Sequence, residues 1–196
     1  MAAEQESIAR AAGIIALGNV ASRLLGLARV QLIAYLFGAS GLVSVFLVAS
    51  TVPTMLYDLL IGGMLSAALV PVFSQVAEQQ GKAALWALFS RVASLVAAIL
   101  AALVLGIEIL APQLAWLLGG GFEPELQAAL AKMLRIISPA VFFFGLSGVV
   151  TGLLYALRRF TYPAFGAAVF NLGILIAAPL LAGRVDAFSL AIGVLL

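Results

Sequence analysis

The stretch Ala11 to Gly38, AAGIIALGNVASRLLGLARVQLIAYLFG, decides the fold class of this chain. About 20 apolar residues form a helix long enough to cross a bilayer, because each residue rises about 1.5 Å. The stretch nevertheless carries Arg23 and Arg29 in its interior. A guanidinium near the bilayer centre costs about 3 kcal/mol, so such side chains normally face a helix bundle or a water-filled cavity. The stretch therefore predicts a transmembrane helix with one cationic side.

The polar residues of this stretch share one side of the expected helix. At about 100° per residue, with Asn19 as the origin, Arg23 falls near +40° and Gly26 near −20°. Ser22 falls at about −60° and Arg29 at about −80° on the same wheel. The opposite side consists of Leu, Ile, Val and Ala. We interpret these residues as a stripe that faces a cavity. The alternative is that both arginines extend to the membrane surfaces, which suits Arg29 better than the more central Arg23.

The composition points to a membrane protein throughout. The chain has 196 residues, of which 65% are hydrophobic and 9% charged, and its mean hydropathy is +1.23. Soluble domains are about 45–50% apolar and 25% charged, so an all-α polytopic membrane protein is the expected class. The net charge of +2 is too small to indicate a nucleic-acid partner. Because the chain has neither His nor Cys, we expect no metal site, no cofactor and no enzymatic activity.

Turn residues divide the chain into about six expected spans, the sixth incomplete. The second contains Pro53 and Gly62-Gly63, which predict a helix break or gate, although a kink made only for packing fits equally well. The last ten residues give about 15 Å of helix, half a bilayer, so we expect a piece of a longer protein. After a cytoplasmic tail over 1–10, the expected spans of this single transmembrane lobe (11–196) are 11–37, 42–77, 84–111, 125–157, 163–181 and 187–196.

Acidic residues are rare in the expected spans. Asp58 lies about 25 Å from the first turn, at nearly the depth of Arg23, about 21 Å from the same turn. The two side chains could form an ion pair, or Asp58 could lie in interfacial water beside Gly62-Gly63. Glu108 is expected at the membrane interface, shortly before Pro112 marks the next connection.

The basic residues predict the orientation of the chain. Cytoplasmic loops carry an excess of Lys and Arg. Five basic residues against three favour a cytoplasmic amino terminus, and the tight turn with Arg158-Arg159 contributes most. The inside ends would hold Arg10, Lys82, Arg91, Arg158 and Arg159, and the outside ends Lys132, Arg135 and Arg184.

A family resemblance emerges from motifs in a fixed order. Ser22 to Arg29, SRLLGLAR, resembles the S-R-x-L-G-x-x-R signature in the first helix of MurJ/MviN-type lipid II flippases, members of the multidrug/oligosaccharidyl-lipid/polysaccharide exporter superfamily. Each motif alone is weak, and their order and spacing carry the resemblance. The further matches are Phe37-Gly38-Ala39, Gly62 to Phe73, Ser138-Pro139, Phe143 to Gly152, Arg159-Phe160, Pro163-Ala164 and Asn171-Leu172.

The resemblance implies one lobe of a two-lobe transporter in the cytoplasmic membrane. Such a flippase moves lipid II, a peptidoglycan precursor linked to undecaprenyl pyrophosphate, by alternating access, so the implied partners are this lipid-linked oligosaccharide, membrane lipids and a carboxy-terminal lobe. Arg23 and Arg29 match arginines that line the family's cationic cavity, and Ser22 and Asn19 join them as candidate ligands. Guanidinium forks fit the oxygen atoms of a pyrophosphate.

The chain departs from the family pattern at three positions. Val30, Ser44 and Tyr57 stand where many members carry charged residues. The alternatives are therefore a polysaccharide-lipid exporter, a multidrug exporter of the same superfamily that uses Asp58 for coupling, or an inactive truncated membrane fragment.

Overall fold

The computed structural model describes the backbone of residues 2–60 and 64–196, and the side chains of 13–55 and 68–196. Over this part all regular secondary structure is helical, without a strand, and short turns join the helices. The all-α prediction is confirmed. The helices are α1 (Ala2–Phe37), α2 (Gly41–Leu60), α3 (Met64–Gln79), α4 (Gly81–Leu118), α5 (Pro124–Ala156), α6 (Thr161–Val185) and α7 (Phe188–Leu195).

Four described stretches are long and apolar enough to cross a membrane. They are Gly13–Phe37, Gly81–Leu118, Pro124–Ala156 and Thr161–Val185, and Gly41–Met55 is a shorter apolar helix. Their outer surfaces expose large apolar side chains such as Leu105 and Ile109 of α4. A surface of this kind suits contact with lipid rather than water. The chain is a multi-pass membrane protein.

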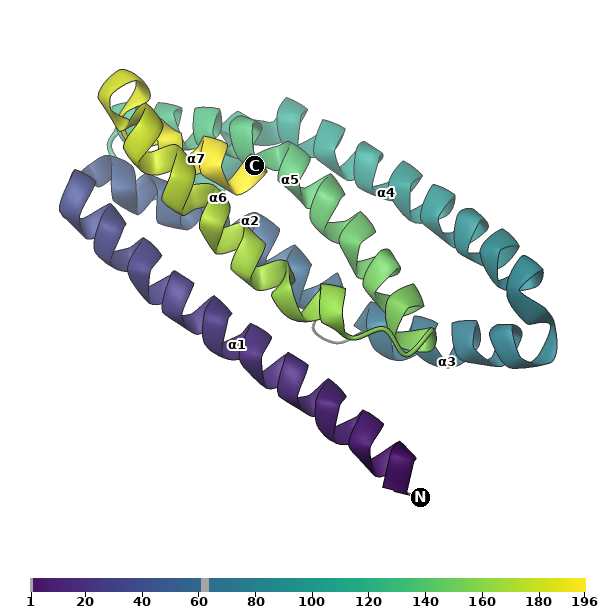
Figure 1. Cartoon of the computed structure of the whole chain (residues 1–196). Helices are drawn as coiled ribbons and strands as arrows, with labels where there is room; N and C mark the ends of the chain where they lie inside the picture. The colour runs from purple at the N-terminus through teal and green to yellow at the C-terminus, as the bar shows by residue number, and fades with distance from the viewer. Residues whose placement is uncertain (1, 61–63) are drawn as a thin grey trace.

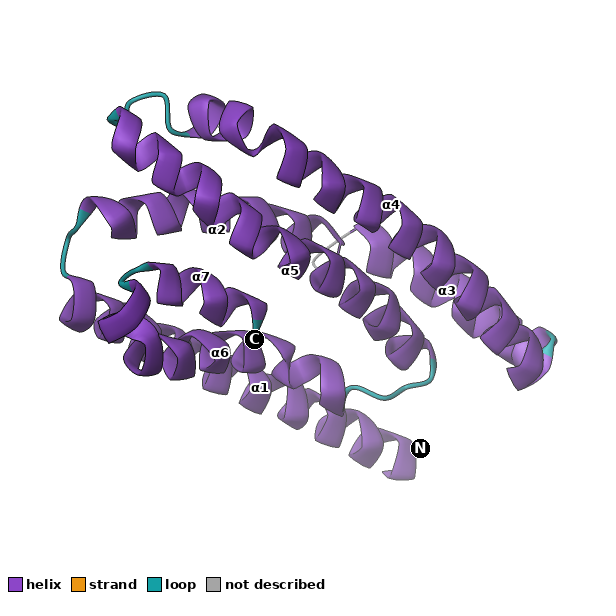
Figure 2. Cartoon of the chain, turned by 90° about the horizontal axis from the view of Figure 1, so that it is seen from above, coloured by secondary structure: helices purple, strands orange, loops and turns teal. Residues whose placement is uncertain are grey.

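The helices are arranged in layers around α5. Figure 2 shows α4 on one side, then α2 and α5, and then α6, α7 and α1, while α3 overlaps α4 in this view. The most extensive helix contacts join α5 to α4 and α2, and α1 to α6. Met133, Leu134 and Ile137 of α5 are almost completely buried at the centre. Because α1 packs mainly against α6, its other sides are open.

Small residues allow the closest helix contacts. Gly145 of α5 has no Cβ, and an added Cβ would collide with the Leu100 side chain of α4. A second cluster, formed by Phe73, Leu85 and Leu153, joins α3, α4 and α5 near one end of the bundle. The amino terminus of α1, the α3–α4 turn and the α5–α6 connection all lie toward this end in Figure 1.

Helix α4 continues beyond Ala111, the expected end of the third span, and runs through Pro112 to Leu118. Proline has no N–H, so the carbonyl group of Glu108, four residues earlier, loses its helical donor. The Nε of Arg135 in α5 donates to this carbonyl oxygen at 3.3 Å. Proline is tolerated inside a membrane helix when a neighbouring helix satisfies the freed group.

The break expected in the second span does not fall at Pro53. Pro53 lies inside α2 and is buried, and α2 runs on to Leu60. Around it, the Ser50 and Thr54 hydroxyl groups donate to carbonyl oxygens one turn back, at 2.8 and 2.7 Å. Back-bonding of this kind bends a helix without ending it. Helix α3 begins at Met64, and Gly62-Gly63 lie outside the described residues.

Candidate functional site

One side of α1 is held against α6 by small residues and one amide. A Cβ at Gly18 would collide with the backbone carbonyl of Ala164. The Nδ2 of Asn171 in α6, which is 6% exposed, donates to the carbonyl oxygen of Ser22 at 3.2 Å and to that of Ala167 at 2.9 Å. A buried amide between membrane helices contributes about 0.6–2 kcal/mol. These contacts determine which side of α1 faces the bundle.

Arg29 lies on this side of α1. Its guanidinium Cζ is 5.5 Å from the ring centroid of Phe170. A cation over an aromatic face is attracted by the ring quadrupole, more strongly when water is excluded. The same ring packs edge-on against Phe144 of α5, with centroids 5.6 Å apart. Arg29 is therefore half-buried and oriented by α6.

Arg23 and Asn19 lie on an exposed side of α1. The structure thus divides the predicted stripe: Ser22 and Arg29 face α6, whereas Asn19 and Arg23 are open. Among the described side chains, neither Arg23 nor Arg29 has a carboxylate partner. Six residues of helix separate them by about 9 Å along the axis. Around the helix they are about 120° apart, so Arg29 lies against α6 and Arg23 points to the open side of α1.

The remaining residues singled out in the sequence are either not described or exposed. The side chains of Asp58 and Tyr57 and the pair Gly62-Gly63 lie outside the described residues, so the Arg23–Asp58 ion pair stays a prediction. Val30 is 58% exposed. Ser44 is also exposed, and its hydroxyl donates to the Ser40 carbonyl oxygen at 3.5 Å.

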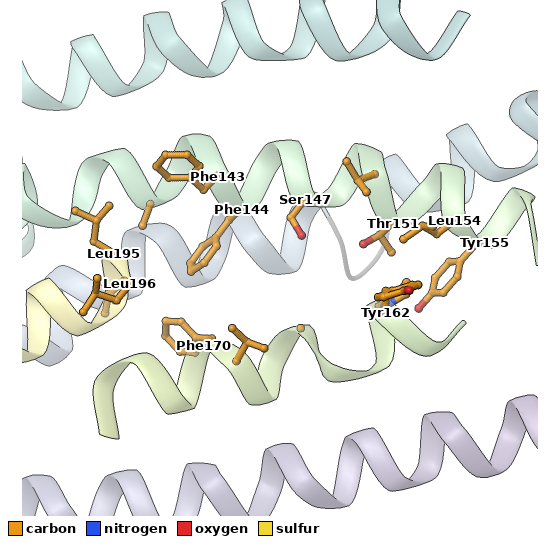
Figure 3. A pocket seen from close by; sticks show the side chains of 16 residues that line it. Phe143, Phe144, Ser147, Thr151, Leu154, Tyr155, Tyr162, Phe170, Leu195 and Leu196 are labelled. Carbon is orange, nitrogen blue, oxygen red and sulfur yellow. The ribbon is translucent and has the colours of Figure 1, made fainter. Parts of the chain in front are cut away.

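A cavity of about 550 Å³ lies between α5, α6 and the end of α7. Figure 3 shows Leu195 and Leu196 at one end and Tyr155 and Tyr162 at the other. Its remaining lining is mostly aromatic and aliphatic, and no Lys or Arg contributes to it. An apolar lining with a few hydroxyl groups suits a hydrocarbon or another helix and does not neutralise a pyrophosphate.

The sequence analysis missed the contact between α4 and α5. The Ser138 hydroxyl, buried in α5, makes a short hydrogen bond to the Glu108 carboxylate of α4. A usable signal was present, because Glu108 precedes Pro112 by four residues and Ser138 directly precedes Pro139. Glu108 was expected only as an interfacial residue. Among the described residues, no group of three or more acidic side chains is close enough to hold a metal ion.

Comparisons with known proteins agree with one family. A family model described as lipid II flippase MurJ matches residues 33–196. The lipid II flippase MurJ of Burkholderia cenocepacia is 34% identical over 175 residues, which are 87% of this chain and 34% of that protein. A probable lipid II flippase MurJ of Synechocystis is 29% identical over 176 residues, 87% of this chain and 32% of that protein.

A solved structure supports the same relationship. It is described as lipid II flippase MurJ in an inward closed conformation, and it matches with a TM-score of 0.80 and 27% identity over 92% of this chain and 38% of that one. The chain spans about a third of the length of the curated relatives it matches. By its sequence and its fold, the chain belongs to the lipid II flippase MurJ family.

Proposed function

We propose that this chain forms the first lobe of a flippase that moves a lipid-linked peptidoglycan precursor across the cytoplasmic membrane by alternating access. The relatives named as lipid II flippases support the substrate class. The observation that carries the proposal is the pair Arg23 and Arg29 on α1, which lack carboxylate partners among the described side chains. A pyrophosphate needs such cationic donors, and guanidinium groups bind its oxygen atoms through paired hydrogen bonds.

The open sides of α1 support a binding role for Arg23. Because α1 contacts mainly α6, Asn19 and Arg23 remain free to face a second lobe or the lipid. A guanidinium in hydrocarbon is costly, so a polar cavity between two lobes is the favourable environment for Arg23. The apolar cavity between α5 and α6 is a poor candidate for the pyrophosphate, since no Lys or Arg lines it.

The first experiment measures ligand binding by the purified chain in lipid nanodiscs. We expect undecaprenyl pyrophosphate to bind, and Arg23→Ala or Arg29→Ala to weaken binding about tenfold or more, because a charge-assisted hydrogen bond is worth about 1.5–3 kcal/mol. Lys should restore the affinity only in part, since it lacks the bidentate fork. Arg91→Ala, which changes an exposed arginine of α4, is the matched control and should bind normally.

The second experiment tests transport in cells. The chain is joined to the remaining two thirds of the Burkholderia cenocepacia relative and expressed in a strain depleted of its own flippase. This chimera should support growth, and the chain 1–196 alone should not, because one lobe has no counterpart to rock against. Stable Arg23→Ala and Arg29→Ala chimeras that grow normally would refute the proposal. If the unsubstituted chimera does not support growth although the chain binds undecaprenyl pyrophosphate, another exporter of the superfamily is favoured instead.

A further inference from the structure

Two prolines inside α4 and α5 each leave a backbone carbonyl group without its helical donor. Pro112 removes the donor for the carbonyl of Glu108, and Pro139 removes the donor for that of Arg135. Both carbonyl groups lie where α4 packs against α5, in the most extensive helix contact of the bundle. An unpaired carbonyl group in an apolar environment costs free energy comparable to a lost hydrogen bond.

Side chains at this contact supply the missing donors. The Nε of Arg135 lies 3.3 Å from the Glu108 carbonyl oxygen, so α5 supports the proline turn of α4. The Ser138 hydroxyl lies 3.0 Å from the Arg135 carbonyl oxygen, within the proline turn of α5 itself. The same hydroxyl also contacts the Glu108 carboxylate, and its single proton serves one of these two acceptors at a time. Ser138 is only 2% exposed, so water does not replace these contacts readily.

We propose that Glu108, Arg135 and Ser138 form an α4–α5 clasp. Arg135 replaces the helix hydrogen bond that Pro112 removes, and Ser138 alternates between replacing the bond that Pro139 removes and binding the Glu108 carboxylate. The clasp makes the two proline turns one coupled hinge. Bending of α4 at Glu108 withdraws the acceptor of Arg135, and bending of α5 displaces both Arg135 and Ser138. While the clasp is closed, α4 and α5 move as one rigid pair. This inference does not depend on the identity of the transported substrate.

The alternative is that Arg135 and Ser138 have separate roles that do not involve Pro112 or Pro139. Arg135 is exposed and could serve only as a charge near the membrane surface, and Ser138 could merely fill space in the core. The clasp makes a distinct prediction: removing a proline should compensate for the loss of its own substitute donor. A charge or a space-filling residue would not be rescued in this way.

The first test concerns Arg135 and uses amide hydrogen exchange of the full chain in lipid nanodiscs. Arg135→Met keeps a long side chain but removes the donor, and we expect exchange in the turn 108–115 to rise about fivefold, the effect of one hydrogen bond. Adding Pro112→Ala restores an N–H opposite the Glu108 carbonyl and should return exchange to within about twofold of the original. Pro179→Ala, which removes a proline inside α6, is the matched control and should not rescue Arg135→Met.

The second test concerns Ser138. Ser138→Ala should raise exchange in the turn 135–142 by a similar factor of about five, and Pro139→Ala should rescue it. Ser147→Ala changes an exposed serine of the same helix that has no hydrogen-bond partner among the described residues, and it should have no effect. Glu108→Gln retains an acceptor for Ser138 and should change exchange less than Ser138→Ala.

The proposal is overturned if Arg135→Met and Ser138→Ala leave exchange unchanged in both turns. It is also overturned if Pro179→Ala rescues Arg135→Met as well as Pro112→Ala does, because the rescue would then reflect general helix stabilisation. Should a single variant not fold, the proline rescue remains decisive: the double variant folds if the clasp exists and fails if the side chain has another role.

Discussion

Arg29 illustrates how one neighbouring residue gives a membrane arginine a defined orientation. Its guanidinium lies over Phe170, and that ring also contacts Phe144 of α5. The predicted stripe placed Arg29 on the same broad face of the helical wheel as Arg23. The wheel does not show from which side an aromatic ring of α6 approaches. The sequence shows that an arginine lies inside the apolar stretch. The packing of α1 against α6 determines that this arginine makes a cation–π contact.

We expect Phe170→Leu to destabilise the chain by about 1–2 kcal/mol, because it removes both the cation–π and the ring–ring contact. A double-mutant cycle with Arg29→Met should assign about 0.5–1 kcal/mol of this to the Arg29–Phe170 pair. Thermal unfolding in detergent, with Phe165→Leu of the same helix as the control, measures the effect. Strict additivity of the two changes would show that the contact contributes nothing.

At the scale of single elements, α1 depends on close backbone approach to α6. Gly18 faces the Ala164 carbonyl without room for a Cβ, whereas a Cβ at Gly26 would find its nearest neighbour, the Asn171 side chain, at 3.8 Å. Sequence periodicity alone does not distinguish these two glycines, since both lie on the same side of α1. The difference arises from the crossing of α1 and α6.

These two glycines should respond oppositely to the same substitution. Gly18→Ala should destabilise the α1–α6 contact by about 1–3 kcal/mol, because the backbones must separate. Gly26→Ala should be neutral or stabilising by up to about 1 kcal/mol, because alanine favours the helix and fits the available space. Thermal unfolding of both variants in the same detergent checks this, and equal destabilisation by the two would contradict the packing described for α1.

For the molecule as a whole, the turns fall at two ends of one bundle. The amino terminus and the turns after α3 and α5 lie toward one end, and those after α1, α4 and α6 toward the other (Figure 1). The orientation predicted from the basic residues places the first end in the cytoplasm. Because Arg158 and Arg159 are exposed in the α5–α6 turn, they are accessible to labelling.

Single cysteines provide a direct test, since the chain has no Cys. We expect Arg159→Cys to react with a membrane-impermeant thiol reagent only after the cells are opened. Gly121→Cys, exposed in the turn between α4 and α5, should react in intact cells and is the matched control. Labelling of residue 159 from outside would reverse the proposed orientation.

The sequence by itself determined the membrane class, the helical fold and the family of this protein. Hydropathy acts over windows of about 20 residues and is therefore local, and the family motifs are read directly along the chain. Only the tertiary structure decided that α4 continues through Pro112, that Ser22 and Arg29 turn toward α6 while Arg23 stays open, and that Glu108 meets Ser138. Each of these outcomes depends on groups from separate helices, such as Arg135 at the Glu108 carbonyl and Asn171 at that of Ser22. Such contacts form only when the helices pack, so no pattern within one helix determines them.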